Sequence, residues 1–232
     1  MKRLILFFTF ICVTTTSTAQ INEIGFFVGG SNYIGDIGPE TYINPNNFMG
    51  GLIYKWNMNP RISFRGTFTY AEISSDDNNA TNKARYIRGI GFNNSIKELA
   101  IGMEFNYFEY NLDSYRNTYT PYLLFEVAVF NYNIVESESP PGSKQYNYKS
   151  KTSFAIPFGI GYKTKLSGDF AIAIELRARY TFEDDIDYNN SEISSLTFGN
   201  PNSNDWYILS GISLVYTFGR PACYANPYKW KI

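Results

Sequence analysis

The sequence contains no histidine in its 232 residues, and this absence excludes several classes of function. Without imidazole there is no Ser-His-Asp triad, no His general acid or base, and none of the usual His-bearing zinc sites. Charged residues are also sparse, at 18% of the chain against roughly 25% in ordinary soluble proteins. The 20 basic and 21 acidic residues nearly cancel, and no sustained run of Lys or Arg indicates a nucleic-acid partner. We therefore predict a protein that is not an enzyme, needs no cofactor and binds no nucleic acid.

The N-terminus has the composition of a secretory signal peptide, which we assign to residues 1–19. Two basic residues precede the mostly apolar stretch Leu4–Val13, and small residues lead to the expected cleavage after Ala19. The stretch is too short to span a bilayer as a helix. A lipoprotein cysteine at Cys12 is the alternative, disfavoured because the residue before it is large rather than small. Cleavage leaves Cys223 as the one cysteine, and no later stretch approaches 18 apolar residues.

The rest of the chain alternates between apolar and polar residues with a period of two, which is typical of β-strands. In Asp169–Phe182, one face carries large residues such as Phe170 and Ile174, while the other carries Ala, Glu and Arg. Similar patterns predict eight strands, at Glu23–Gly30, Phe48–Trp56, Arg61–Ile73, Glu98–Tyr107, Tyr122–Tyr132, Ser153–Lys163, Asp169–Phe182 and Trp206–Phe218. The length suits one large β domain.

The composition of the two strand faces predicts the environment. One face is large and aromatic, and the other consists of Gly, Ala, Ser and Thr with scattered Glu and Arg. Small side chains suit the lumen of a narrow barrel, and an aromatic face suits contact with lipid. We therefore predict an all-β fold, an eight-stranded antiparallel transmembrane β-barrel of the outer-membrane type over residues 20–218. The alternative is a secreted lipocalin-like barrel with its faces reversed, whose outer face should carry many Lys and Glu; the corresponding positions here carry almost none.

The connections between the predicted strands alternate in length. The long connections are Ser31–Asn47, Ser74–Lys97, Asn133–Thr152 and Glu183–Asp205. The short connections are Asn57–Pro60, Asn111–Thr120 and Thr164–Gly168. Outer-membrane barrels have short periplasmic turns and long outward loops. The pattern predicts outer-membrane localisation with both termini in the periplasm, including a tail at residues 219–232.

Several charged residues lie on the predicted lumen face or in the loops. The expected interior set is Arg61, Arg65, Glu98, Glu104, Glu175, Arg177 and Arg179. Because buried charges need partners and no His is present to activate a nucleophile, we interpret this set as ion pairs that plug the barrel rather than as a catalytic site. The acidic run Glu183–Asp187 lacks the Gly and distal Glu of a known calcium loop, so we expect a solvated loop and no metal site. Basic residues Lys83, Arg85 and Arg88 would suit lipopolysaccharide phosphates, as would basic residues in any outer-membrane loop.

Several segments resemble PorG-like proteins of the type IX secretion system. The most specific are the SNYIGDIG stretch within Glu23–Gly38 and the RPxCY tail at Arg220–Tyr224. Phe154–Lys163, Arg177–Asp187 and Asn204–Tyr207 also match, so the resemblance spans nearly the whole chain after the signal peptide. It implies an outer-membrane component of a protein-export and gliding apparatus. In that family the barrel associates with a periplasmic ring made of a lipoprotein and a partner protein.

The tail and the outward loops suggest different partners. An odd cysteine in an exported protein indicates an intermolecular disulfide or a free thiol, and the periplasm permits disulfides. We therefore predict that Arg220, Pro221, Cys223 and Tyr224 contact the ring implied by the resemblance. The alternative is a small OmpA- or OmpX-like surface barrel whose outward loops bind an extracellular partner. A lipid-modifying enzyme is the third class, disfavoured because known small examples depend on His.

Overall fold

The structure is a computed structural model that describes residues 21–112, 118–140, 143, 145–200 and 203–219. The predicted signal peptide and the tail residues Arg220, Pro221, Cys223 and Tyr224 lie outside the described residues.

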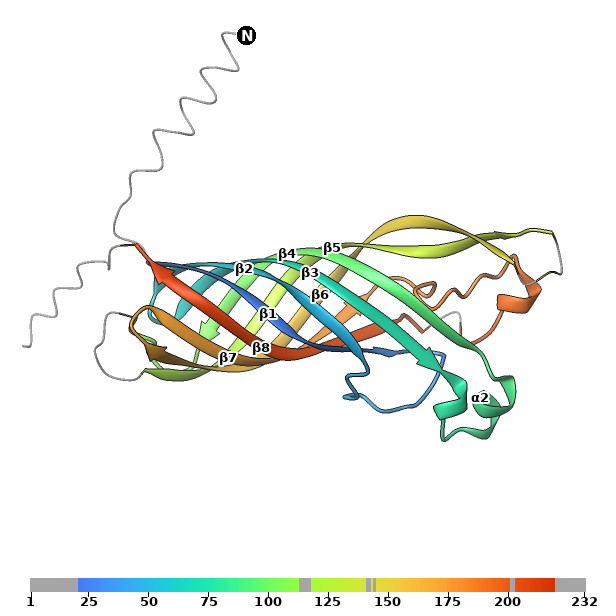
Figure 1. The fold of residues 1–232 in the computed structure, drawn as a ribbon, viewed down its shortest axis with the longest axis horizontal. Coiled ribbons are helices and arrows are strands. Elements are labelled where there is room, and N and C mark those ends of the chain that lie inside the picture. The colour runs from blue at the N-terminus through green and yellow to red at the C-terminus, as the bar shows by residue number, and fades with distance from the viewer. Residues whose placement is uncertain (1–20, 113–117, 141–142, 144, 201–202, 220–232) are drawn as a thin grey trace, which may run out of the picture.

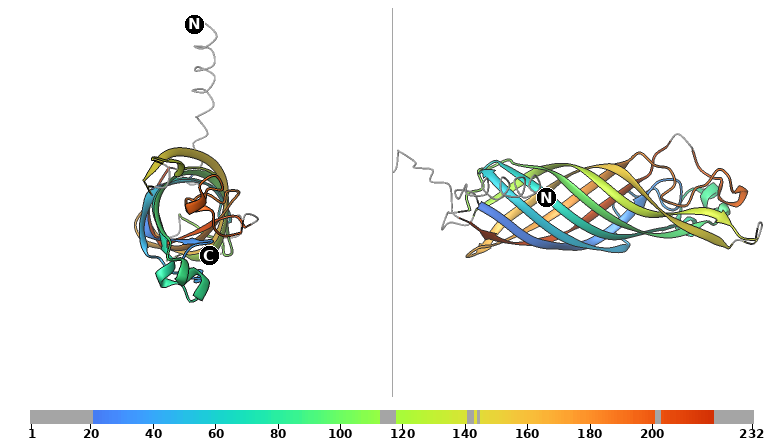
Figure 2. Two further views of the ribbon diagram at one scale, coloured as in Figure 1. Left: turned by 90° about the vertical axis from the view of Figure 1, so that its right-hand side faces the viewer. Right: turned by 90° about the horizontal axis from the view of Figure 1, so that it is seen from above.

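Eight antiparallel strands form one closed barrel in chain order (Figure 1). Their bounds are β1 Ile21–Ile34, β2 Asn47–Asn59, β3 Ile62–Asp76, β4 Gly91–Asn106, β5 Tyr119–Glu138, β6 Tyr146–Ser167, β7 Phe170–Thr181 and β8 Trp206–Phe218. Each strand pairs with the next, and β1 pairs with β8 from Asn22–Phe218 to Ile34–Trp206, which closes the ring (Figure 2). The described parts of the connections contain three short helices: η1 Asp77–Asn79, α2 Lys83–Arg88 and η2 Ser194–Leu196. The predicted fold class and all eight strands are confirmed.

Two predicted connection lengths are wrong. The connection expected at Asn133–Thr152 is mostly strand, because β5 and β6 continue pairing as far as Glu138–Tyr146 and leave only residues 139–145 between them. No regular apolar alternation marks the extension in the sequence, because its aliphatic residues Ile134 and Val135 are adjacent and polar residues occupy most of its other positions. The β4–β5 connection, expected to be short, runs from 107 to 118.

The two ends of the barrel differ in their connections. Both barrel termini and the tight turns at residues 60–61 and 168–169 lie at one end, which we call the proximal end. Loops 35–46, 77–90, 139–145 and 182–205 lie at the opposite, distal end. Figure 1 shows that α2 and the β5–β6 hairpin both extend from this distal end, on opposite sides of the barrel.

The face assignment predicted from alternation is confirmed. Along β4, Leu99 and Ile101 are exposed by 61% and 64%, while Ala100 between them is fully buried. Along β7, Ile174 is exposed and its neighbours Ala173 and Glu175 are buried. An apolar outer surface around a polar lumen is the arrangement of a transmembrane barrel. Within the described ranges, no helix is long and apolar enough to cross a membrane.

Candidate functional site

The lumen contains a charge-balanced set of buried side chains. Five carboxylates and five cations from the strands are at most 4% exposed: Glu23, Glu98, Glu104, Glu126, Glu175, Lys55, Arg65, Lys163, Arg177 and Arg179. Because an unpaired charge in so narrow an interior would be strongly destabilising, the equal numbers suggest that the set acts as one network.

Glu104 of β4 is one centre of this network. Its carboxylate lies 2.9 Å from Lys55 Nζ on β2 and 3.4 Å from Arg65 Nη1 on β3, and it also accepts a hydrogen bond from Lys163 on β6. One carboxylate thus connects cations from three other strands. This connection holds opposite walls of the barrel together.

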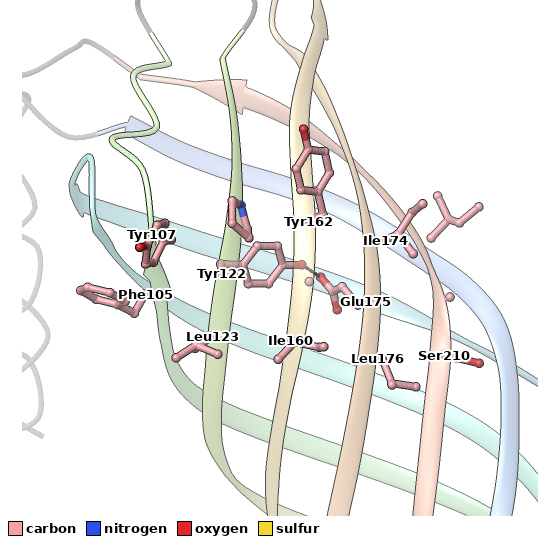
Figure 3. A pocket seen from close by; sticks show the side chains of 14 residues that line it. Phe105, Tyr107, Tyr122, Leu123, Ile160, Tyr162, Ile174, Glu175, Leu176 and Ser210 are labelled. Carbon is pink, nitrogen blue, oxygen red and sulfur yellow. Dashed lines mark hydrogen bonds between the residues drawn. The ribbon is translucent and has the colours of Figure 1, made fainter. Parts of the chain in front are cut away.

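Arg65 and Glu175 form a second centre that crosses the lumen. Arg65 donates two parallel hydrogen bonds of 2.9 and 2.8 Å to the Glu175 carboxylate on β7, the strongest geometry for such a pair. Tyr122 of β5 donates a further hydrogen bond of 2.6 Å to Glu175 (Figure 3). Gly161 of β6 lies directly beside the Tyr122 ring. A Cβ at Gly161 would lie 2.3 Å from the Tyr122 ring, so only glycine leaves room for this contact.

A third centre joins β4, β7 and β8. Arg179 donates hydrogen bonds of 3.2 and 3.0 Å to the two oxygens of Glu98, and Tyr207 donates one of 2.6 Å to the same carboxylate. The guanidinium of Arg177 stacks 4.3 Å from the ring of Phe27 on β1. In the part of the chain that the structure describes, side chains therefore fill the lumen, as expected for eight strands, and leave no aqueous channel wide enough for a protein.

Six of the seven predicted interior residues occupy this network. Arg61 is the exception, because it lies in the β2–β3 turn, is exposed, and is 3.6 Å from Glu109, which is also exposed. Four further charged residues of the network were not in the set predicted from the sequence: Glu23, Lys55, Glu126 and Lys163. Each of these occupies an inward position of its strand, so the alternation itself marks them.

Figure 3 also shows the outer wall beside this network. Phe105, Leu123 and Ile160 line a shallow apolar hollow of about 990 Å³ in the barrel surface. In a membrane this hollow faces acyl chains, so it needs no other ligand.

The distal mouth of the barrel is capped by its own loops. Ile186 of loop 182–205 is fully buried and packs in a cluster with Tyr33, Ile37 and Phe92. Asn94 of β4 fixes it by donating a hydrogen bond of 2.9 Å to the Ile186 carbonyl. Ile186 therefore anchors this loop to the folded core.

Helix α2 adds to the cap. Asn82 caps its N-terminus, and Gly89 adopts the left-handed conformation (φ 63°) that ends it. Arg88 then forms a 2.7 Å ion pair with Asp77, and its guanidinium lies 4.9 Å from the Phe198 ring. Arg88 and the backbone N–H groups that donate to Asp77 lower the pKa of its carboxyl. Arg85 likewise donates a hydrogen bond of 2.9 Å to the Gly38 carbonyl, so both arginines contribute contacts inside the cap. Contact of Lys83, Arg85 and Arg88 with lipopolysaccharide stays a prediction.

The acidic run Glu183–Asp187 differs from the solvated loop expected. Lys151 lies 2.6 Å from both Glu183 and Asp185, and Asp187 is only 2% exposed. Burial raises the pKa of Asp184 to about 6. Within the described ranges, no three His, Cys, Asp or Glu residues are arranged to hold a metal ion. A polar cleft of about 840 Å³ separates this loop from the β5–β6 hairpin.

The closed ring, the apolar outer surface and the charged lumen define the class of the protein: an eight-stranded β-barrel of the outer-membrane type. The chain belongs to the family described as "Domain of unknown function (DUF6089)", whose profile matches residues 2–227. No curated protein matches the chain.

Among solved structures, the chain is similar to three outer-membrane proteins at low identity. For the N-terminal β-barrel domain of Pseudomonas aeruginosa OprF, identity is 9%, coverage is 87% of this chain and 98% of that chain, and the TM-score is 0.46. For Yersinia pestis Ail in complex with the heparin analogue sucrose octasulfate, identity is 14%, coverage is 86% of this chain and 99% of that chain, and the TM-score is 0.47. For a major outer membrane protein from Thermus thermophilus, identity is 12%, coverage is 86% of this chain and 100% of that chain, and the TM-score is 0.47.

Proposed function

We propose that the protein is a non-enzymatic anchoring component of a type IX secretion and gliding machine in the outer membrane. The observation that carries this proposal is the filled lumen, in which Glu104, Glu175 and Glu98 connect opposite walls. A barrel sealed in this way cannot be the conduit for folded cargo, so a role in anchoring or assembly remains. The assignment to the type IX machine in particular rests on the segments that resemble PorG-like proteins.

The proposed orientation places the proximal end in the periplasm. The start of β1 and the end of β8 lie there, with the tight turns 60–61 and 168–169 and the longer connection 107–118. Outer-membrane barrels likewise have both chain ends in the periplasm. A chain leaving β8 at Phe218 would then carry Arg220, Pro221, Cys223 and Tyr224 toward a periplasmic ring. We propose that these tail residues contact the ring lipoprotein and its partner, with Cys223 available for a disulfide.

A surface-binding role is the second candidate. It is favoured by the distal cleft of about 840 Å³ between loop 182–205 and the protruding β5–β6 hairpin. In that case the distal loops would bind an extracellular partner and the tail would be dispensable.

Affinity capture of the tagged barrel after mild crosslinking tests the proposal. We expect periplasmic ring proteins to be recovered with the wild type and to be lost when residues 220–232 are removed. Non-reducing electrophoresis with a thiol-blocking reagent should show a larger species that is absent in Cys223→Ser. Recovery of extracellular proteins alone, unaffected by loss of the tail, would refute the anchoring role and favour the second candidate.

A further inference from the structure

Two buried carboxylates share one phenol at the distal mouth. The Tyr33 hydroxyl, at the end of β1, lies 2.9 Å from Asp187 Oδ2 and also contacts Asp205 Oδ1. Tyr33, Asp187 and Asp205 are at most 4% exposed. The phenol also accepts a hydrogen bond from the Asp36 backbone N–H at 3.2 Å, which uses one of its lone pairs.

The hydrogen-bond inventory of this cluster requires an additional proton. A phenol carries one O–H and can donate to only one carboxylate, because an ionised carboxylate is acceptor-only. The second contact becomes a hydrogen bond only when one of the two aspartates is protonated and donates to the phenol oxygen. Two buried anions meeting at one hydroxyl without that proton would repel each other.

The surrounding charges favour a bound proton. Asp36 from loop 35–46 and Asp184 from loop 182–205 add negative charge near the pair. Arg88 of α2 is the cation facing Asp187, but it is hydrogen-bonded to Asp77 and to the Asp36 carbonyl. Burial, followed by the Asp187 charge, raises the pKa of Asp205 to about 9, and burial raises that of Asp187 to about 7. A metal ion is not favoured, since no suitable group of ligands occurs within the described ranges.

The same two aspartates fix loop 182–205. Asp205 Oδ2 accepts a hydrogen bond of 3.1 Å from the backbone N–H of Ile186, the residue that plugs the mouth. Asp187 Oδ1 accepts one of 3.0 Å from the Asn189 N–H. The cluster therefore connects β1, the plug residue and the last residue before β8.

We propose that Tyr33, Asp187 and Asp205 form a proton-dependent clasp that keeps loop 182–205 closed over the distal mouth, and that loss of the shared proton releases the loop. In the closed state the cluster binds a proton. In the open, solvated state the aspartates have their ordinary pKa, so they lose this proton once the pH exceeds that value. By linkage, closure is complete in acid and weakens as the pH rises, until the pH reaches the pKa of the closed cluster. This device is independent of the machine to which the barrel is attached.

Hydrogen–deuterium exchange of the purified barrel, followed by mass spectrometry of peptides from 182–205, tests the clasp. After correction for intrinsic exchange, the open population should rise about tenfold per pH unit between pH 6 and pH 8 for one proton. In Asp205→Asn the amide cannot ionise and can donate to Tyr33, so this rise should disappear. Peptides of β3 and β4 should show no such change.

Matched variants separate the clasp from general effects of pH. Glu136→Gln, which removes an exposed carboxylate 2.8 Å from Lys149 in the neighbouring hairpin, should retain the wild-type pH dependence. Tyr33→Phe should leave the loop open at both pH values. Heat-modifiable electrophoretic migration verifies that each barrel is folded, and Asp187→Asn replaces Asp205→Asn should the latter fail to fold.

Three results would overturn the proposal. One is equal protection of the wild-type loop at pH 6 and pH 8. Another is a pH dependence in Asp205→Asn, or in Asp187→Asn where it serves as the replacement, as steep as that of the wild type. The third is loss of protection at pH 6 on adding a chelator, with recovery in Ca²⁺, which would assign the cluster to a cation.

Discussion

Replacing Glu104 with Gln should destabilise the barrel more than the loss of any surface charge. The carboxylate is fully buried and contacts Lys55, Arg65 and Lys163, so its neutralisation leaves the lumen with an uncompensated positive charge. Breaking a buried ion pair by removing one partner costs about 3–5 kcal/mol, a large fraction of the roughly 5–15 kcal/mol that stabilises a typical domain. Gln keeps the size of the side chain, so the effect reports charge rather than a cavity.

Reversible unfolding in urea or guanidinium from lipid vesicles, followed by Trp fluorescence, measures this free energy. Glu109→Gln is the matched control, because it removes an exposed carboxylate paired with the exposed Arg61 and should leave the unfolding free energy unchanged within error. A double variant with Lys55→Met restores the charge balance and should recover part of the loss. An unfolding free energy for Glu104→Gln equal to that of Glu109→Gln would refute the network as a source of stability.

Three further predictions test the faces, the packing and the orientation. Ile160→Arg should lower the yield of heat-modifiable barrel, because Arg on a lipid face costs about 2–4 kcal/mol near the midplane, while Ala173→Ser in the lumen should not; equal yields would contradict the face assignment. Gly161→Val should destabilise the barrel by displacing the Tyr122 ring, and an unchanged melting temperature would show that the ring can move. Cysteine at Ser143 should react with an impermeant maleimide on intact cells, and labelling only after outer-membrane permeabilisation would reverse the proposed orientation.

The sequence predicts the strands and their faces because both follow from local alternation. In β7 every second residue from Phe170 faces outward, and lipid outside with small or charged residues inside enforces that period. The pairing partners could not be predicted in the same way. Arg65 and Glu175 are separated by 110 positions and meet only because the barrel closes.

The distal cap is the part of the molecule where local pattern gives the least information. Asp187 and Asp205 belong to a loop whose acidic composition is typical of a solvated segment. They are buried because Ile186 packs into the mouth and brings them to Tyr33. Such burial depends on contacts between β1 and a loop more than 150 residues later in the chain. No periodicity in the loop marks this tertiary contact.

Complementation of a deletion strain, with secreted proteins quantified in the medium, tests the anchoring role most directly. The variants to compare are a chain truncated after Gly219 and a chain in which loops 77–90 and 139–145 are shortened to tight turns, each matched for the amount of folded barrel. The anchoring proposal predicts that truncation abolishes export while the loop variant still exports. Export that survives truncation and is lost with the loops would contradict it.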